Sequence, residues 1–154
     1  MNRLCENALG QLEQHFGYLE RNHGFRRIAV EPSSAGNRCL VILEGPCRIR
    51  FVFDLGGTEV SVGSLEAPIG WGDKSAGRRR WFPVWGVINR ARGLPKLTPE
   101  QFMELGRKLL SDGHDAYLAR LAASLDEVMD QVAAGFAPAR AEQEEQSLEA
   151  YCFG

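Results

Sequence analysis

Apolar residues follow a helical period in the first part of the chain and a strand period in the next. Over residues 4–19 they recur at spacings of three and four, which predicts an amphipathic helix that ends at Gly24. From residue 25 to residue 65 the period is two, and turn sequences at Gly45-Pro46 and Gly56-Gly57 separate the runs. Because connections this short join antiparallel strands, the pattern predicts a four-stranded meander.

A glycine-rich segment, residues 66–80, interrupts the pattern and is predicted to be a surface loop. Trp81, Phe82, Trp85 and Ile88 then fall at helical spacing. A second helix opens at Thr98-Pro99, where a hydroxyl cap precedes a proline at the first helical position. Its expected buried side consists of Phe102, Leu105, Leu109 and Leu110.

A long closing helix follows, with a leucine and valine seam between Leu118 and Val132. The element order favours one α+β domain over residues 1–137. In it, a four-stranded antiparallel meander packs against an N-terminal helix and a C-terminal pair of helices. Residues 138–154 are acidic and polar, and we expect a short helix or a disordered tail there.

Charge is unevenly distributed although the formal total is only -2. Seven basic residues and no acidic ones lie between Lys74 and Lys96, whereas seven acids and one base lie between Asp126 and Glu149. With 44% hydrophobic residues, the composition is that of a soluble globular domain. The small negative total tells against a general nucleic-acid-binding protein, which is usually basic.

The most unusual stretch is GRRRWFPVW at residues 77–85, where three arginines run into three aromatic residues. In one interpretation Trp81 and Trp85 are buried and the arginines are solvated at the start of an element. In a second, the stretch is a docking patch for a protein. In a third, the arginines contact phosphates while a tryptophan stacks on bases, as in nucleic-acid-binding modules.

Trp71 lies close to this stretch in sequence, within the glycine-rich segment. Tryptophan and arginine are among the residue types enriched at the centres of protein interfaces. We therefore take four residues as the candidate protein-binding surface: Trp71, Arg78, Arg79 and Arg80. The acidic C-terminal tail either shields this surface or makes contacts of its own.

Signals for catalysis are sparse. The chain has no phosphate-binding loop, no dinucleotide fingerprint and no nucleophile elbow. His15, His23 and His114 lie on different predicted elements and lack the spacing of metal ligands. We expect a protein that is not an enzyme and has no cofactor and no metal, with an enzyme that uses a nonstandard pocket as an alternative.

The four cysteines form no Cys-x-x-Cys pair. In the expected hairpin register, Cys39 and Cys47 are too far apart to form a disulfide, so reduced and mostly buried thiols are predicted. No apolar run resembles a signal peptide or a membrane span. Together these features predict a cytoplasmic protein that does not associate with a membrane.

Two fragments resemble a class of small bacterial proteins that includes immunity proteins of polymorphic toxin systems. The opening helix ends in LERNHGF (19–25) and the closing helix ends in VAAGF (132–136), and the resemblance covers roughly residues 9–137. It implies a non-catalytic protein that blocks a toxin or another protein by surface complementarity, and it transfers no site residues. A homodimer stays open, and a nucleic-acid partner is the disfavoured alternative.

Overall fold

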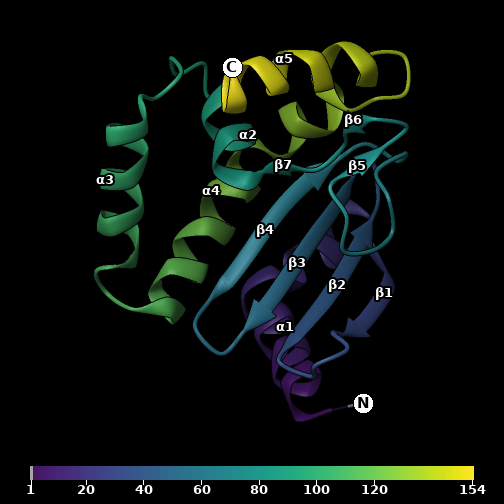
Figure 1. Ribbon diagram of the computed structural model, residues 1–154, viewed down its shortest axis with the longest axis vertical. Helices are drawn as coiled ribbons and strands as arrows, with labels where there is room; N and C mark the ends of the chain where they lie inside the picture. Colours follow the sequence, from purple (N-terminus) through teal and green to yellow (C-terminus); the bar gives the residue numbers. More distant parts are fainter. Residues whose placement is uncertain (1) are drawn as a thin grey trace.

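The computed structural model describes residues 2–154 and has helices packed against one face and one end of an antiparallel sheet (Figure 1). The helices are α1 (Arg3–His23), α2 (Val84–Ala91), α3 (Pro99–Leu110), α4 (His114–Gly135) and α5 (Ala141–Phe153). The strands are β1 (Arg26–Pro32), β2 (Arg38–Glu44), β3 (Arg48–Asp54), β4 (Thr58–Gly63), β5 (Lys74–Ser75), β6 (Arg78–Arg79) and β7 (Phe82–Pro83). This confirms the predicted α+β class, with its N-terminal helix, meander and C-terminal helices.

The main sheet has the strand order β1-β2-β3-β4-β7, and every neighbouring pair is antiparallel. The first four strands are the predicted meander. The fifth strand was not predicted, and it corrects the helix expected to include Trp81 and Phe82. Phe82 pairs with Val62 of β4, and the extended backbone of Pro83 (ψ 133°) delays the start of α2 until Val84.

The larger core lies between this sheet and the helices α1, α2 and α4. The apolar face of α1 supplies Leu12, Phe16 and Leu19, all at most 5% exposed. The ring of Phe16 meets the ring of Phe51 on β3 edge-to-face, with centroids 4.9 Å apart. None of the helices within residues 2–154 is both long and apolar enough to cross a membrane.

The opposite face of the sheet is covered by the segment of residues 64–80. Leu40 and Ile42 of β2 pack there against Trp81 in a second, smaller core cluster. Arg50 of β3, only 4% exposed, donates hydrogen bonds to the carbonyl oxygens of Gly70 (3.2 Å) and Gly72 (2.8 Å). It also pairs with the carboxylate of Asp73 and lies over the ring of Trp81. A buried arginine thus fastens this segment to the sheet.

The same segment contains a small hairpin that the sequence did not predict. Its strands β5 and β6 are joined by Ala76 and Gly77, both with positive φ (53° and 75°). Two such residues are typical of the tight turn in a two-residue hairpin. Part of the predicted surface loop therefore forms a two-stranded sheet. Its second strand places Arg78 and Arg79 next to α5, where they form ion pairs with Glu142 and Glu149.

The prediction of four reduced thiols is wrong for two of them. Cys5, in the first turn of α1, forms a disulfide with Cys39 of β2, with a Cα–Cα distance of 5.3 Å. This bond joins a helix to a strand across the core, so the hairpin register of Cys39 and Cys47 gives no information about it. Cys47 and Cys152 are free, and burial raises the pKa of the Cys47 thiol to about 12.

Removing the disulfide should destabilise the fold substantially, because the bond closes a loop with a sequence separation of 34. We expect the double variant Cys5→Ser/Cys39→Ser to lose about 3 kcal/mol of unfolding free energy, measured by urea titration. The matched control Cys152→Ser, which removes a free and only partly buried thiol, should differ little from wild type. Equal stability of the double variant and wild type would show that the bond contributes nothing.

Candidate functional site

The three arginines of the candidate surface lie under the C-terminal helix. Arg78 and Arg80 donate hydrogen bonds to the carboxylate of Glu145 at 2.9 and 3.0 Å. The Nε atom of Arg79 lies 3.3 Å from the carboxylate of Glu149. The side chains of Arg78, Arg79 and Arg80 are 40%, 24% and 13% exposed. The structure therefore gives these arginines an internal partner, and only Arg78 keeps substantial contact with solvent.

Glu145 is the centre of this contact between β6 and α5. Its side chain is 3% exposed and accepts a further hydrogen bond from the hydroxyl of Ser64 at 3.3 Å. The adjacent residue, Glu144, pairs with Arg90 of α2. Within residues 138–154, predicted as a short helix or a disordered tail, residues 141–153 thus form a helix whose carboxylates neutralise the basic stretch.

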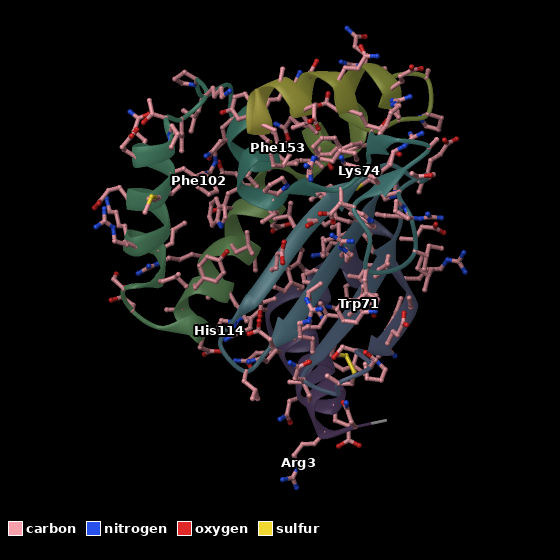
Figure 2. The ribbon with its side chains drawn as sticks, viewed as in Figure 1. Arg3, Trp71, Lys74, Phe102, His114 and Phe153 are labelled. Carbon is pink, nitrogen blue, oxygen red and sulfur yellow. A yellow bond between two sulfur atoms is a disulfide. The ribbon has the colours of Figure 1, made fainter. Side chains whose placement is uncertain are left out.

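Trp71 has different contacts from the three arginines. Its ring packs against the small cluster of Leu40 and Ile42, and the guanidinium group of Arg38 lies 4.9 Å from the ring centroid. Figure 2 shows it in front of the sheet, at some distance from α5. The four predicted surface residues thus do not share one contact surface.

The three histidines make single contacts between neighbouring elements. The ring Nε2 atoms lie 2.8 Å from oxygen atoms of three partners: Asp115 for His15, Asp126 for His23 and Thr58 for His114. Within residues 2–154, no group of three or more His, Cys, Asp or Glu side chains is arranged to hold a metal ion. The histidines therefore join α1 to α4 and α4 to β4.

Helix α3 differs from the other helices in its lack of buried residues. It buries none of its residues, so the predicted buried side of Phe102, Leu105, Leu109 and Leu110 is wrong. Figure 1 shows α3 standing at the edge of the molecule, attached through the segments before and after it. Its apolar residues therefore form a face without a full complement of partners.

The two ends of α3 are nevertheless well defined. Thr98 and Gln101 form a reciprocal capping box at its start. At its end, Arg120 of α4 donates a hydrogen bond to the carbonyl oxygen of Leu109 at 3.1 Å and pairs with Asp112. The helix is thus positioned by polar contacts at its ends, whereas in its middle Leu105 and Leu109 are only partly buried against the body.

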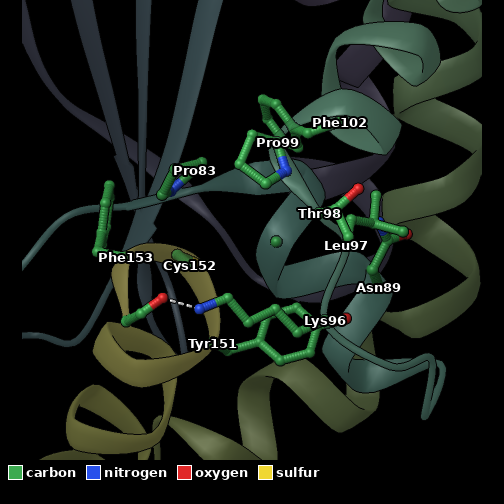
Figure 3. A pocket seen from close by; sticks show the side chains of 12 residues that line it. Pro83, Asn89, Lys96, Leu97, Thr98, Pro99, Phe102, Tyr151, Cys152 and Phe153 are labelled. Carbon is green, nitrogen blue, oxygen red and sulfur yellow. Dashed lines mark hydrogen bonds between the residues drawn. The ribbon is translucent and has the colours of Figure 1, made fainter.

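Two hollows separate α3 from the body, and Phe102 lines both of them. The first, of about 410 Å³, lies between the start of α3, α2 and the end of α5 (Figure 3), where Leu97, Tyr151 and Phe153 line it. The second, of about 270 Å³, lies between α3, the start of α4 and the turn before β4. We call the two hollows together the α3 groove.

The walls of the α3 groove are mainly apolar. In the second hollow the indole nitrogen of Trp85 donates to the hydroxyl of Tyr117 at 3.1 Å, so this polar pair is satisfied and the rings remain as an apolar wall. Gly106 also lines this hollow, and a Cβ atom added there would meet nothing within 4 Å. The groove therefore has room for apolar side chains from outside the chain.

Exposed apolar side chains concentrate around this groove. The large exposed ones of the described chain are Leu55, Leu65, Ile69, Leu94, Phe102, Met103, Leu110 and Phe153. Five of these eight lie on α3, in the segment that leads to it, or in the wall of the first hollow: Leu94, Phe102, Met103, Leu110 and Phe153. Contiguous exposed apolar patches on soluble proteins commonly mark interaction sites. We call this set, with the α3 groove, the α3 face.

Cys152 lines the first hollow, and its thiol is the side chain there that could act as a nucleophile. Burial, together with the nearby carboxylate of Glu149, raises the pKa of its thiol to about 11. The thiol is therefore protonated at neutral pH, whereas a nucleophilic cysteine needs its thiolate form. The geometry of the groove suits binding better than covalent chemistry.

Comparison of the chain with models of protein families, with curated proteins and with solved structures gives no match. The function therefore has to be inferred from the geometry of the α3 face and of the arginine cluster.

The buried carboxylate of Glu145 should be important for stability. Replacing it in Glu145→Gln leaves Arg78 and Arg80 without their shared counter-charge, and we expect a loss of about 3 kcal/mol in unfolding free energy. Glu142 also pairs with Arg78, at 3.4 Å, but its side chain is 72% exposed. The control Glu142→Gln should therefore change stability by no more than about 0.5 kcal/mol. Equal effects of the two substitutions in urea titrations would show that burial of Glu145 is unimportant.

Proposed function

We propose that the protein works without catalysis, by binding another protein through the α3 face. The observation that carries the proposal is the unburied amphipathic helix α3 beside an apolar groove. Grooves of this kind accept the apolar face of a helix or an extended segment from a partner. Phe102, which borders both hollows and is 50% exposed, is the natural anchor for such a contact.

A bacterial toxin is the first partner class to test. This choice rests on the resemblance of the opening and closing helices to bacterial immunity proteins. An immunity protein blocks its target by covering a surface, which needs an exposed and complementary face and no catalytic groups. The α3 face meets this requirement.

Binding through Trp71 and the arginines is a second candidate surface for the same function. Glu145 and Glu149 already pair with all three arginines, and of these only Arg78 keeps substantial exposure, so a protein partner at this surface would contact mainly Trp71 and Arg78. The same pairing disfavours binding of nucleic acid, since a phosphate would have to compete with carboxylates held in the same chain. An enzyme is disfavoured by the protonated Cys152 thiol and by the apolar walls of the groove.

The cellular location is also a proposal. Disulfides are rare in cytosolic proteins and persist in oxidising compartments. The bond between Cys5 and Cys39 therefore favours an oxidising compartment over the cytoplasm that the cysteine spacing predicted. Trapping the thiols of native cells by alkylation before lysis, followed by mass spectrometry, would distinguish the two locations.

Capture experiments with matched variants test the proposed function. We expect tagged wild-type protein to recover a stoichiometric protein partner from native extract, and Phe102→Asp to weaken that binding by about thirtyfold or more. Ile69→Asp is the matched control, because Ile69 has a similar exposure, 55%, in the segment that covers the other face of the sheet.

The two candidate surfaces predict different results. Loss of capture in Trp71→Ala with full capture by Phe102→Asp would move the binding surface to Trp71 and Arg78. Failure of the wild-type protein to recover any stoichiometric partner would contradict the proposed function.

A further inference from the structure

The first hollow of the α3 groove contains a buried amide without a partner. Asn89 of α2 lines this hollow and is only 6% exposed. Its backbone carbonyl oxygen accepts a hydrogen bond from the backbone nitrogen of Leu94 at 3.0 Å, but within residues 2–154 its side chain forms no hydrogen bond. Figure 3 shows this side chain among the residues around the hollow.

The amide of Asn89 is reached from the hollow. Within residues 2–154, the side-chain atoms that are both fully enclosed and without a hydrogen bond are the Nε atoms of Arg50, Arg79 and Arg80. The amide atoms of Asn89 are not among them, so they keep some accessible surface although the residue is buried. Since Asn89 lines the hollow, this surface faces the space inside it.

A buried amide in this position needs an occupant of the hollow to complete its hydrogen bonds. Leaving a buried donor or acceptor unpaired costs free energy, and native proteins nearly always supply a partner from the chain, from water or from a ligand. A side-chain amide offers two N–H donors and one carbonyl acceptor. The best partner is therefore a group that donates and accepts at the same time.

The other polar side chains around the hollow already have partners. The hydroxyl of Thr98 takes part in the capping box of α3, and the hydroxyl of Tyr151 donates to the carbonyl oxygen of Leu94 at 2.8 Å. The ammonium group of Lys96 donates to the backbone oxygen of Gly154 (Figure 3). The amide of Asn89 is thus the group that can select the polar part of a ligand.

The size and the walls of the hollow suit a small molecule. Its volume of about 410 Å³ lies within the range of about 300–1,000 Å³ that is typical of ligand pockets. Leu97, Pro99, Phe102 and Phe153 give it apolar walls, and no acidic side chain of the described chain lines it. Apolar walls with a single available polar group are typical of sites that bind a mainly apolar ligand in one orientation.

We propose that the first hollow binds a small neutral molecule with an apolar body and a carboxamide or lactam group. The carbonyl oxygen of the ligand accepts from Nδ2 of Asn89, its N–H donates to Oδ1, and its body lies against the apolar walls. A carboxylate or an ester fits less well, because neither has an N–H for Oδ1. The inference goes beyond the proposed function and does not rest on it, because it uses the interior of the hollow and not the exposed side of α3.

Three probes of similar size test the ligand class on the wild-type protein. The probes are 3-phenylpropanamide, methyl 3-phenylpropanoate and 3-phenylpropanoate, which share an apolar body and a carbonyl group. We expect the amide to bind about tenfold more tightly than the other two, because it alone donates to Asn89. Titrations followed by NMR measure the affinities, and the side-chain amide signals of Asn89 should shift. Equal affinities of the three probes, or no binding of the amide, would overturn the inference.

Replacing Asn89 tests whether this residue is the selecting group. In Asn89→Leu a side chain of similar size lacks both hydrogen-bonding groups, so 3-phenylpropanamide should lose its tenfold advantage over the methyl ester. Unfolding in urea checks that the variant folds. The control Asn22→Leu changes an exposed asparagine of α1 and should keep the advantage. A folded Asn89→Leu variant that still prefers the amide would contradict the proposed site.

The free thiols locate the bound probe without any substitution. Cys152 lines the same hollow, and Cys47 is a buried free thiol that serves as the reference. Saturating 3-phenylpropanamide should slow the reaction of Cys152 with methyl methanethiosulfonate several-fold, measured by mass spectrometry at alkaline pH, where part of the thiol is ionised. An unchanged rate at Cys152 while the amide is bound would place the probe elsewhere and overturn the inference.

Water is the alternative occupant, and the proposed function fails in a different way. Contact of the Asn89 amide with an ordered water molecule that 3-phenylpropanamide does not displace would refute the ligand site. A protein that binds this amide but captures no protein partner would refute the proposed function alone. A protein that captures a partner, loses it in Phe102→Asp and binds no amide would refute the inference alone.

Discussion

A helix in a globular protein derives most of its stability from burying an apolar face, and short helices are marginal in water without that contribution. Helix α3 is the only helix within residues 2–154 that buries no side chain, yet its capping box and its contacts with Arg120 define its ends. The apolar side of α3 is not buried, although an amphipathic helix is normally stabilised by burying that side. The proposed docking of another protein on the α3 face depends on this missing packing.

The charges of the molecule serve a different purpose. The basic residues of the stretch that is most conspicuous in the sequence are paired within the chain. Helix α5 places Glu145 against Arg78 and Arg80, and Glu144 against Arg90. On the other face of the sheet, Arg50 fastens residues 70–73 in a similar way. Arginine in this protein mainly fixes irregular segments to the sheet and to the last helix. The apolar surface, by contrast, is concentrated around α3.

The sequence was a good guide wherever a single period decided the structure. The amphipathic pattern of α1 and the alternation in β1 to β4 depend on local spacing, and both elements formed as predicted. The predicted start of α2 was wrong because Phe82 pairs with Val62 on β4 instead of joining the helix, and helical spacing alone does not reveal this pairing. The disulfide between Cys5 and Cys39 was missed for a similar reason, since it depends on how α1 packs on β2.

The candidate site was the least predictable part. The amphipathic pattern of α3 was visible in the sequence, but a pattern of that kind indicates only that the helix has an apolar side. Whether the chain itself covers that side depends on where the segments on either side of α3 place it. Gly93 and Gly113, both with positive φ, redirect the backbone at these positions, and no periodicity reports their effect. Likewise, the partner of the arginines was a stretch of acidic residues more than sixty positions away.

Oxidation of two methionines by hydrogen peroxide tests most directly whether the α3 face is a docking surface. Met103 is 67% exposed on α3, and Met129 of α4 is 1% exposed and serves as the internal reference. In dilute purified protein, Met103 should be oxidised to the sulfoxide much faster than Met129. In native extract that contains a partner, Met103 should become protected while Met129 is unchanged. Oxidation of Met103 at the same rate in dilute purified protein and in this extract would contradict the account.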